Sequence, residues 1–216
     1  MICFDKRGHG KSDLPIDAFS HLDDFKSLMD ALELRKITII GSSAGGALAI
    51  DFALQYPEMV KDLVLVCPAL TGYPFPPIFI SEGMNLYITG QSEGPEVAIQ
   101  KYISNPFYEY CFPSPNRANA RAKVIEIVKE SVNIFRWNPM WEADMKNSSY
   151  ERIGEIQVPV LIISADKDSK LVQKIGEYIH SKIKHSKEIM MKDCCHFPFV
   201  EKPEEFNEIV LDFLKG

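Results

Sequence analysis

Short runs of β-branched and other apolar residues alternate with amphipathic segments at the two ends of the chain. The amphipathic segments repeat apolar residues at the i, i+3, i+4 spacing of a helix that has one face on a core. Predicted strands cover residues 1–5, 36–40, 60–68, 158–164 and 187–191, and predicted helices cover residues 22–34, 47–56, 170–184 and 203–214. Strands that alternate with helices are typical of a parallel sheet covered by helices. The sequence therefore predicts an α/β fold with a mostly parallel sheet and flanking helices.

The middle of the chain has a different character. Prolines at positions 74, 76, 77, 95, 106, 113, 115 and 139 separate segments rich in aromatic residues, and β-branched runs are absent. This pattern predicts a helical insertion with helices near residues 94–103 and 116–135, and irregular structure at 73–77 and 105–115. We therefore divide the chain into a core, residues 1–70 and 156–216, and an inserted helical lid, residues 71–155.

Composition excludes several classes of protein. The chain has 216 residues, of which 46% are hydrophobic, and 24 basic against 30 acidic residues give a net charge of −6. No basic stripe suits a nucleic acid, and no apolar run approaches the roughly 20 residues of a membrane helix. The N-terminus does not resemble a secretory leader, so we expect a cytoplasmic protein. Five cysteines without CxxC spacing argue against a disulfide framework or a zinc site, and we interpret them as buried thiols.

The sharpest local motif is the pentapeptide at residues 41–45, Gly-Ser-Ser-Ala-Gly, which lies between a predicted strand and a predicted helix. Small residues on both sides of Ser43 allow a tight turn that exposes its hydroxyl at the carboxyl edge of a sheet, as a nucleophile requires. The same pattern also fits a glycine-rich turn in which Ser43 only caps the helix. The pattern alone leaves both interpretations open.

Serine becomes a nucleophile when a histidine base, oriented by a carboxylate, takes its proton. Asp168 follows the predicted strand 158–164, and His196 follows the last predicted strand. Each candidate thus lies in a loop after a strand, and the chain order is Ser, Asp, His. This order is the one expected of an α/β-hydrolase.

Four stretches carry a resemblance to that family, the α/β-hydrolase-fold serine esterases and C–C bond hydrolases. They resemble the D-x-R-G-x-G-x-S turn, the nucleophile elbow, the acid strand and the histidine loop, at residues 4–13, 40–46, 159–168 and 195–203. The family usually has glycine at positions 165 and 195, where this chain has alanine and cysteine.

The resemblance implies a serine hydrolase that acts on small, apolar carboxylic esters. Ser43 is the expected nucleophile, His196 the base and Asp168 its orienter, with the Ala44 N–H in the oxyanion hole; no cofactor and no metal are expected. The family's first three strands and its second oxyanion loop would precede residue 1, so we expect impaired activity and an open sheet edge that favours a homo-oligomer. Two rival functions stay open: a C–C bond or lactone hydrolase with the same triad, and a non-catalytic binding module.

Three other features of the sequence have chemical interpretations that compete with these. Asp166 is a second candidate acid, whereas the segment after the strand 60–68 offers no carboxylate. Cys194 and Cys195 adjoin His196, but neighbouring side chains in an extended loop point apart, which favours packed thiols over a Cys–His dyad. The Gly-Lys-Ser sequence at 10–12 lacks the first glycine of a phosphate-binding loop.

The remaining polar residues are interpreted as a solvated surface. They include three histidines outside the motifs and an acidic group in the insertion that has no histidine at metal-ligand spacing. These residues are His21, His180 and His185, and Glu126, Glu130, Glu142 and Asp144.

Overall fold

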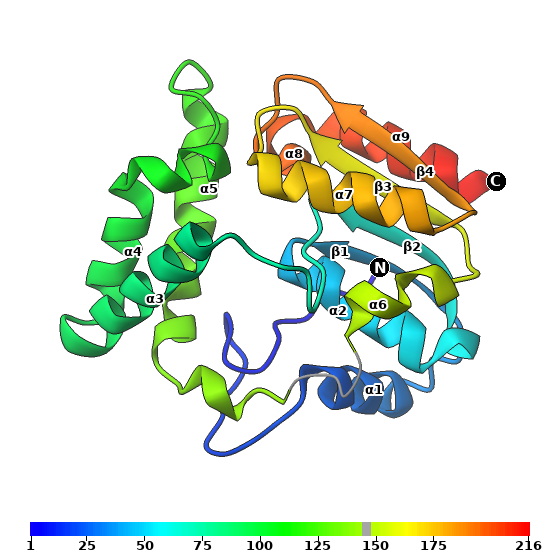
Figure 1. Ribbon diagram of the computed structural model, residues 1–216, viewed down its shortest axis with the longest axis horizontal. Helices are drawn as coiled ribbons and strands as arrows, with labels where there is room; N and C mark the ends of the chain where they lie inside the picture. Colours follow the sequence, from blue (N-terminus) through cyan, green and yellow to red (C-terminus); the bar gives the residue numbers. More distant parts are fainter. Residues whose placement is uncertain (144–147) are drawn as a thin grey trace. The chain divides into compact units, whose positions relative to one another are not determined.

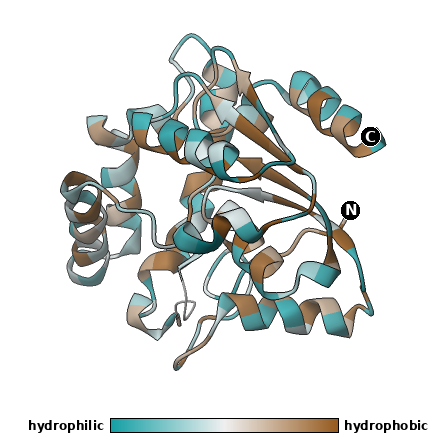
Figure 2. Ribbon diagram, turned by 45° about the vertical axis from the view of Figure 1, so that its right-hand side comes forward, coloured by the Kyte–Doolittle hydropathy of each residue, from teal (hydrophilic) through white to brown (hydrophobic). Residues whose placement is uncertain are grey.

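A four-stranded parallel sheet organises one part of the molecule. The computed structural model describes residues 1–143 and 148–216. The strands β1 (Ile37–Ser42), β2 (Val60–Val66), β3 (Val160–Ala165) and β4 (Ser186–Met191) lie in the order β1-β2-β3-β4, and all neighbours are parallel. The predicted α/β class with a parallel sheet is confirmed, and these four predicted strands are observed within about two residues. Most of this sheet is coloured as hydrophobic in Figure 2.

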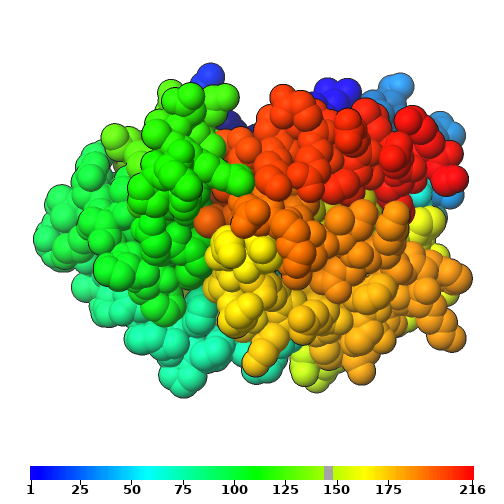
Figure 3. Space-filling view, turned by 90° about the horizontal axis from the view of Figure 1, so that it is seen from above, coloured from blue at the N-terminus to red at the C-terminus, as the bar shows by residue number. Residues whose placement is uncertain are grey.

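Helices cover both faces of this sheet (Figure 1). Side chains of β3 alternate between the faces. Gly176 of α7 (Lys170–Lys182) lies against Ile162 and Ser164, which belong to one face. The opposite face packs against α9 (Pro203–Lys215), whose Val210 joins Val64, Leu161 and Ile163 in the core. Figure 3 shows α9 at the molecular surface, in red. The sheet is therefore a central layer between helices, as its apolar composition requires.

The other helices of this part precede, join or follow the strands along the chain. α1 (His21–Ala31) precedes β1, α2 (Ala44–Gln55) joins β1 to β2, and two short helices, α6 (Ser149–Arg152) and α8 (Pro198–Glu201), flank β3 and α9. 3₁₀ turns at Pro57–Met59 and Ile153–Glu155 precede β2 and β3.

The chain divides into two compact units. One comprises residues 26–73 and 145–216 and holds the sheet; the other comprises residues 1–25 and 74–144. The second unit contains α3 (Pro77–Ser92), α4 (Pro95–Ser104), α5 (Ala118–Glu130) and 3₁₀ helices at Pro106–Cys111, Ser131–Phe135 and Pro139–Trp141. The insertion is helical, as predicted.

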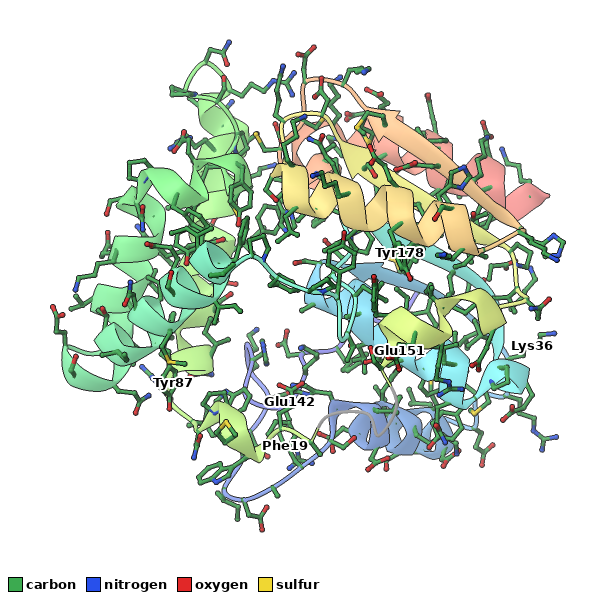
Figure 4. The ribbon with its side chains drawn as sticks, in the orientation of Figure 1. Phe19, Lys36, Tyr87, Glu142, Glu151 and Tyr178 are labelled. Atoms are coloured by element: carbon green, nitrogen blue, oxygen red, sulfur yellow. The ribbon has the colours of Figure 1, made fainter. Side chains whose placement is uncertain are left out.

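Residues 1–25 have a defined place in the second unit. The Arg7 guanidinium binds the Asp24 carboxylate with two hydrogen bonds of 2.7 and 2.6 Å. Trp137 donates its indole N–H to Gly8 O at 3.2 Å. Phe19 forms an isolated parallel bridge with Glu142, and both side chains are labelled in Figure 4.

Two local predictions were wrong. Residues 1–5 form no strand, because β-favouring side chains make a strand only where a neighbour pairs with the backbone groups. Helix α3 was missed because its apolar residues surround the helix: Ile80, Met84 and Ile88 are exposed, while the buried positions are Thr89 and Gly90. Such an arrangement lacks the one-sided period from which a helix is predicted, although Pro77 at the first helical position is a typical start signal.

Thr71 and Ser149, which precede and follow the second unit's helical segment in the sequence, are both bonded to α2 within the sheet-bearing unit. The buried carboxylate of Asp51, on α2, accepts hydrogen bonds from Thr71 at 2.8 Å and from Ser149.

Within the described residues, no helix is long and apolar enough to cross a membrane.

Candidate active site

Ser43 occupies a sharp turn between β1 and α2. Its backbone has φ 52° and ψ −120°, a conformation that side-chain-bearing residues rarely adopt. The Ser43 N–H donates to Val66 O at 3.0 Å, which fixes the turn to the end of β2. A Cβ atom on Gly41 would lie 2.3 Å from Gly45 O, so the turn requires glycine at position 41. The sequence therefore builds a strained elbow that carries Ser43 at the carboxyl end of β1.

Ala44 is the first residue of α2 and is exposed. The N–H groups of the first helical turn have no acceptor within the helix, and they carry the positive end of its dipole. The Ala44 N–H can therefore stabilise a negative oxygen beside Ser43.

Asp168 lies in the loop after β3, and its side chain is fully buried. Its Oδ1 accepts the Ser169 N–H at 2.6 Å. The buried amide of Gln173 donates to three carbonyl oxygens of this loop, those of Ala165, Asp166 and Asp168, at 3.2, 3.2 and 2.9 Å. These bonds hold the loop, and thus the carboxylate, in one position.

His196 follows β4 and is buried. Its Nδ1 lies 2.7 Å from Asp168 Oδ2. An ionised carboxylate only accepts hydrogen bonds, so Nδ1 must carry the proton that is donated to Asp168. Nε2 then carries the lone pair that a base needs. The loop is braced by Glu201, whose Oε1 accepts the Cys195 N–H at 2.6 Å. The structure thus brings Asp168 and His196 together.

The carboxyl ends of all four parallel strands lie along one edge of the sheet. Ser43 directly follows β1 on this edge, and the loops of Asp168 and His196 follow β3 and β4. These three predicted residues therefore share one sheet edge within one unit.

The competing assignments have other partners. Asp166 Oδ1 accepts the Cys194 N–H at 3.3 Å, which links the acid loop to the histidine loop. Cys194 and Cys195 are both buried, as expected for packed thiols, but Cys3 is exposed, so the prediction of five buried thiols is wrong at that position. His180 and His185 are exposed, as predicted, and so are Glu126, Glu130 and Glu142; Asp144 lies outside the described residues.

The interpretation of His21 as a solvated histidine is wrong. It is 6% exposed, because its ring packs edge-on against Phe19 at 4.9 Å and against His9 at 5.7 Å. Burial, together with the charges of Lys6 and His9, lowers the pKa of His21 to about 4. Sequence alone could not reveal these neighbours, which come from other segments.

The sequence predicts only a buried thiol at Cys67, and the structure places this thiol beside the candidate acid and base. Its Sγ, a carboxylate oxygen of Asp168 and a ring nitrogen of His196 all lie within 4.8 Å of one another. Burial raises the pKa of the Cys67 thiol well above its usual value, and the neighbouring Asp168 carboxylate raises it further. A metal binds the thiolate, so this chemistry favours a hydrogen-bonded cluster over a metal site.

Comparison with known proteins identifies the family. The alpha/beta hydrolase fold family matches residues 1–203. The chain belongs to this family. A putative 2-succinyl-6-hydroxy-2,4-cyclohexadiene-1-carboxylate synthase of Bacillus subtilis is 27% identical, over 99% of this chain and 80% of that protein. A 2-hydroxy-6-oxononadienedioate/2-hydroxy-6-oxononatrienedioate hydrolase of Pseudomonas putida is 29% identical, over 99% of this chain and 76% of that protein.

A solved structure shows the same fold. The enol-lactonase from Burkholderia xenovorans superimposes with a TM-score of 0.77, over 98% of this chain and 79% of that chain, with 20% sequence identity.

Proposed function

We propose that this alpha/beta hydrolase is a serine hydrolase that cleaves small carboxylic esters through Ser43, His196 and Asp168. The observation that carries the proposal is the 2.7 Å hydrogen bond between His196 and the buried Asp168, at the sheet edge where the strained elbow carries Ser43. A histidine held in this way is a suitable general base, and a strained elbow between a strand and a helix is a suitable position for a nucleophile.

The proposed mechanism assigns one task to each group. His196 Nε2 takes the proton of the Ser43 hydroxyl while its oxygen attacks the ester carbonyl. The Ala44 N–H binds the oxyanion of the tetrahedral intermediate. His196 then protonates the leaving alcohol, and water, activated by the same nitrogen, hydrolyses the acyl-enzyme to release the acid. Asp168 keeps the imidazole in the required tautomer and stabilises its charged form.

The insertion, residues 71–155, is proposed to be the helical lid of this hydrolase. Its aromatic residues include a packed group around Phe79, Phe107 and Tyr108, with ring centroids 4.9 Å apart in each successive pair. These rings pack against one another, so the insertion has an apolar interior of its own. The proposal is supported by the helical character of the insertion.

Labelling with a fluorophosphonate probe tests the proposal, because the probe reacts only with an activated serine. We expect stoichiometric labelling of the wild-type protein, loss of labelling in Ser43→Ala, and unchanged labelling in Ser42→Ala, the neighbouring serine. Labelling retained in Ser43→Ala would place the nucleophile elsewhere. A folded wild-type protein without any labelling would favour the non-catalytic binding module.

A second candidate is the hydrolysis of a C–C or lactone bond by the same three residues. It is favoured by the hydrolase of P. putida, which is named for 2-hydroxy-6-oxo acids and is 29% identical along nearly the whole chain. Steady-state kinetics with an aryl ester, a lactone and a 2-hydroxy-6-oxo-dienoate distinguish the candidates. The substrate with the highest kcat/KM identifies the reaction, because this ratio measures transition-state binding.

A further inference from the structure

Cys67 takes the same position after β2 that Ser43 takes after β1. Each residue directly follows its strand, and each has a left-handed backbone, with φ 43° at Cys67 and 52° at Ser43. The Cys67 N–H donates to Ile163 O at 2.8 Å, which extends the hydrogen-bond ladder between β2 and β3 beyond the last residue of β2. The direction of the Cys67 side chain is therefore fixed by the sheet.

A side chain at this position is held under strain. Left-handed backbone is unfavourable for an L-residue, whereas glycine adopts it freely. Cys67 is nevertheless 1% exposed and belongs to the apolar core of the sheet. A residue kept in such a conformation beside a reactive group is a candidate for a functional role.

The Cys67 thiol lies beside the Asp168 carboxylate, which can accept further hydrogen bonds. A carboxylate offers about four acceptor positions, and Ser169 and His196 each donate to one oxygen of Asp168. Burial keeps the Cys67 thiol protonated at neutral pH by raising its pKa, and the charge and hydrogen bonding of Asp168 act in the same direction. Cys67 is therefore a hydrogen-bond donor beside Asp168, and its burial excludes it as a nucleophile for a substrate.

We propose that Cys67 is a positioning residue of the active site, whose thiol donates a hydrogen bond to the Asp168 carboxylate and so fixes the group that orients His196. This inference rests on the proposed function for its kinetic consequences only. The thiol withdraws part of the carboxylate charge from His196. Its removal leaves more negative charge facing the ring, which favours the imidazolium, and it also frees the carboxylate to rotate.

The test compares Cys67→Ala, Cys67→Ser and Cys67→Gly with Cys194→Ala. Serine restores a hydrogen-bond donor of similar size. Glycine also lacks the donor but suits the left-handed backbone, so it can be measured if the alanine variant does not fold. Cys194 supplies the matched control, because it is a fully buried thiol in the same apolar core. The main readout is the pH midpoint of the His196 ring by NMR, which does not depend on turnover. The second readout is kcat and KM for an aryl ester.

We expect Cys67→Ala and Cys67→Gly to move the His196 midpoint upward by about half a pH unit, roughly threefold in proton affinity. Cys67→Ser should return it toward the wild-type value, and Cys194→Ala should lower Tm without moving it. The kcat should fall several-fold in Cys67→Ala with little change in KM. An unmoved midpoint in both Cys67→Ala and Cys67→Gly, with a loss of Tm like that of Cys194→Ala, would reduce Cys67 to a space-filling residue and overturn the inference. A moved midpoint in a protein that no fluorophosphonate labels would retain the Cys67–Asp168 bond and reject the proposed function.

Discussion

His21 should make the protein less stable at acidic pH, and His21→Phe should remove that dependence. The ring is 6% exposed, and within the described residues neither ring nitrogen has a hydrogen-bond partner. Glu142 Oε1 is 3.7 Å from Nε2, beyond a hydrogen bond. His21 is also the first residue of α1, where the helix dipole disfavours a cation. These surroundings explain why burial, together with Lys6 and His9, lowers the pKa of His21 to about 4.

The magnitude follows from linkage between protonation and folding. In the unfolded chain the imidazole titrates near pH 6.5, so the unfolded state binds more protons than the folded state between about pH 4 and about pH 6.5. The contribution of the neutral His21 ring to the free energy of unfolding is fully present above about pH 6.5 and is lost as the pH falls toward about 4. The loss amounts to about 2 kcal/mol near pH 5 and about 3 kcal/mol near pH 4.

Urea unfolding of the wild type and His21→Phe, at pH 7 and at pH 5, measures this contribution. Phenylalanine preserves the edge contact with Phe19 and introduces no polar atom, so we expect equal or greater stability at pH 7. Between the two pH values the wild type should lose about 2 kcal/mol more than the variant does. Equal losses would show that His21 does not titrate as a buried neutral group, and a variant strongly destabilised at pH 7 would show that the imidazole nitrogens have partners.

Three further substitutions test the supports of the site. Gly41→Ala should destabilise the fold by about 2–3 kcal/mol and abolish probe labelling, because its Cβ would lie 2.3 Å from Gly45 O; thermal unfolding and labelling check both effects. Gln173→Leu should cost about 1–3 kcal/mol and lower kcat, because the three carbonyls of the acid loop lose their amide donor; a lower Tm with unchanged kcat would limit Gln173 to stability. Asp168→Asn should reduce kcat on the order of 10³- to 10⁴-fold with the fold intact, measured by ester hydrolysis and circular dichroism.

The sequence predicted those parts of the molecule that depend on local pattern. Glycine spacing around Ser43 indicated the elbow, and the positions of Asp168 and His196 after predicted strands indicated a common sheet edge. The strands themselves were predictable because buried parallel strands are continuous apolar runs. Residues 1–5 have a similar composition, and yet they form no strand, because pairing depends on a neighbour that composition does not specify.

The supports of the site could not be predicted, because they depend on contacts between distant segments. Gln173 lies on the buried side of an amphipathic helix, and a polar residue there was the one available signal. Cys67 comes close to Asp168 only because β2 and β3 are neighbours in the sheet. The environment of His21 likewise depends on Phe19 and His9 and on how the chain folds back between them.

The strand order also restricts which residue can follow β2. Because β2 lies between β1 and β3, the residue at position 67 is buried and close to both Asp168 and His196. A carboxylate there would lie against a second buried carboxylate, and like charges at such distances cannot both ionise without a large cost. One of the two carboxyl groups would hold a proton and donate it to the charged one, in competition with the hydrogen bond from His196. A neutral donor avoids this conflict and still fills one of the acceptor positions of Asp168. With the acid placed after β3, a neutral thiol after β2 therefore leaves Asp168 without a competing carboxylate at position 67.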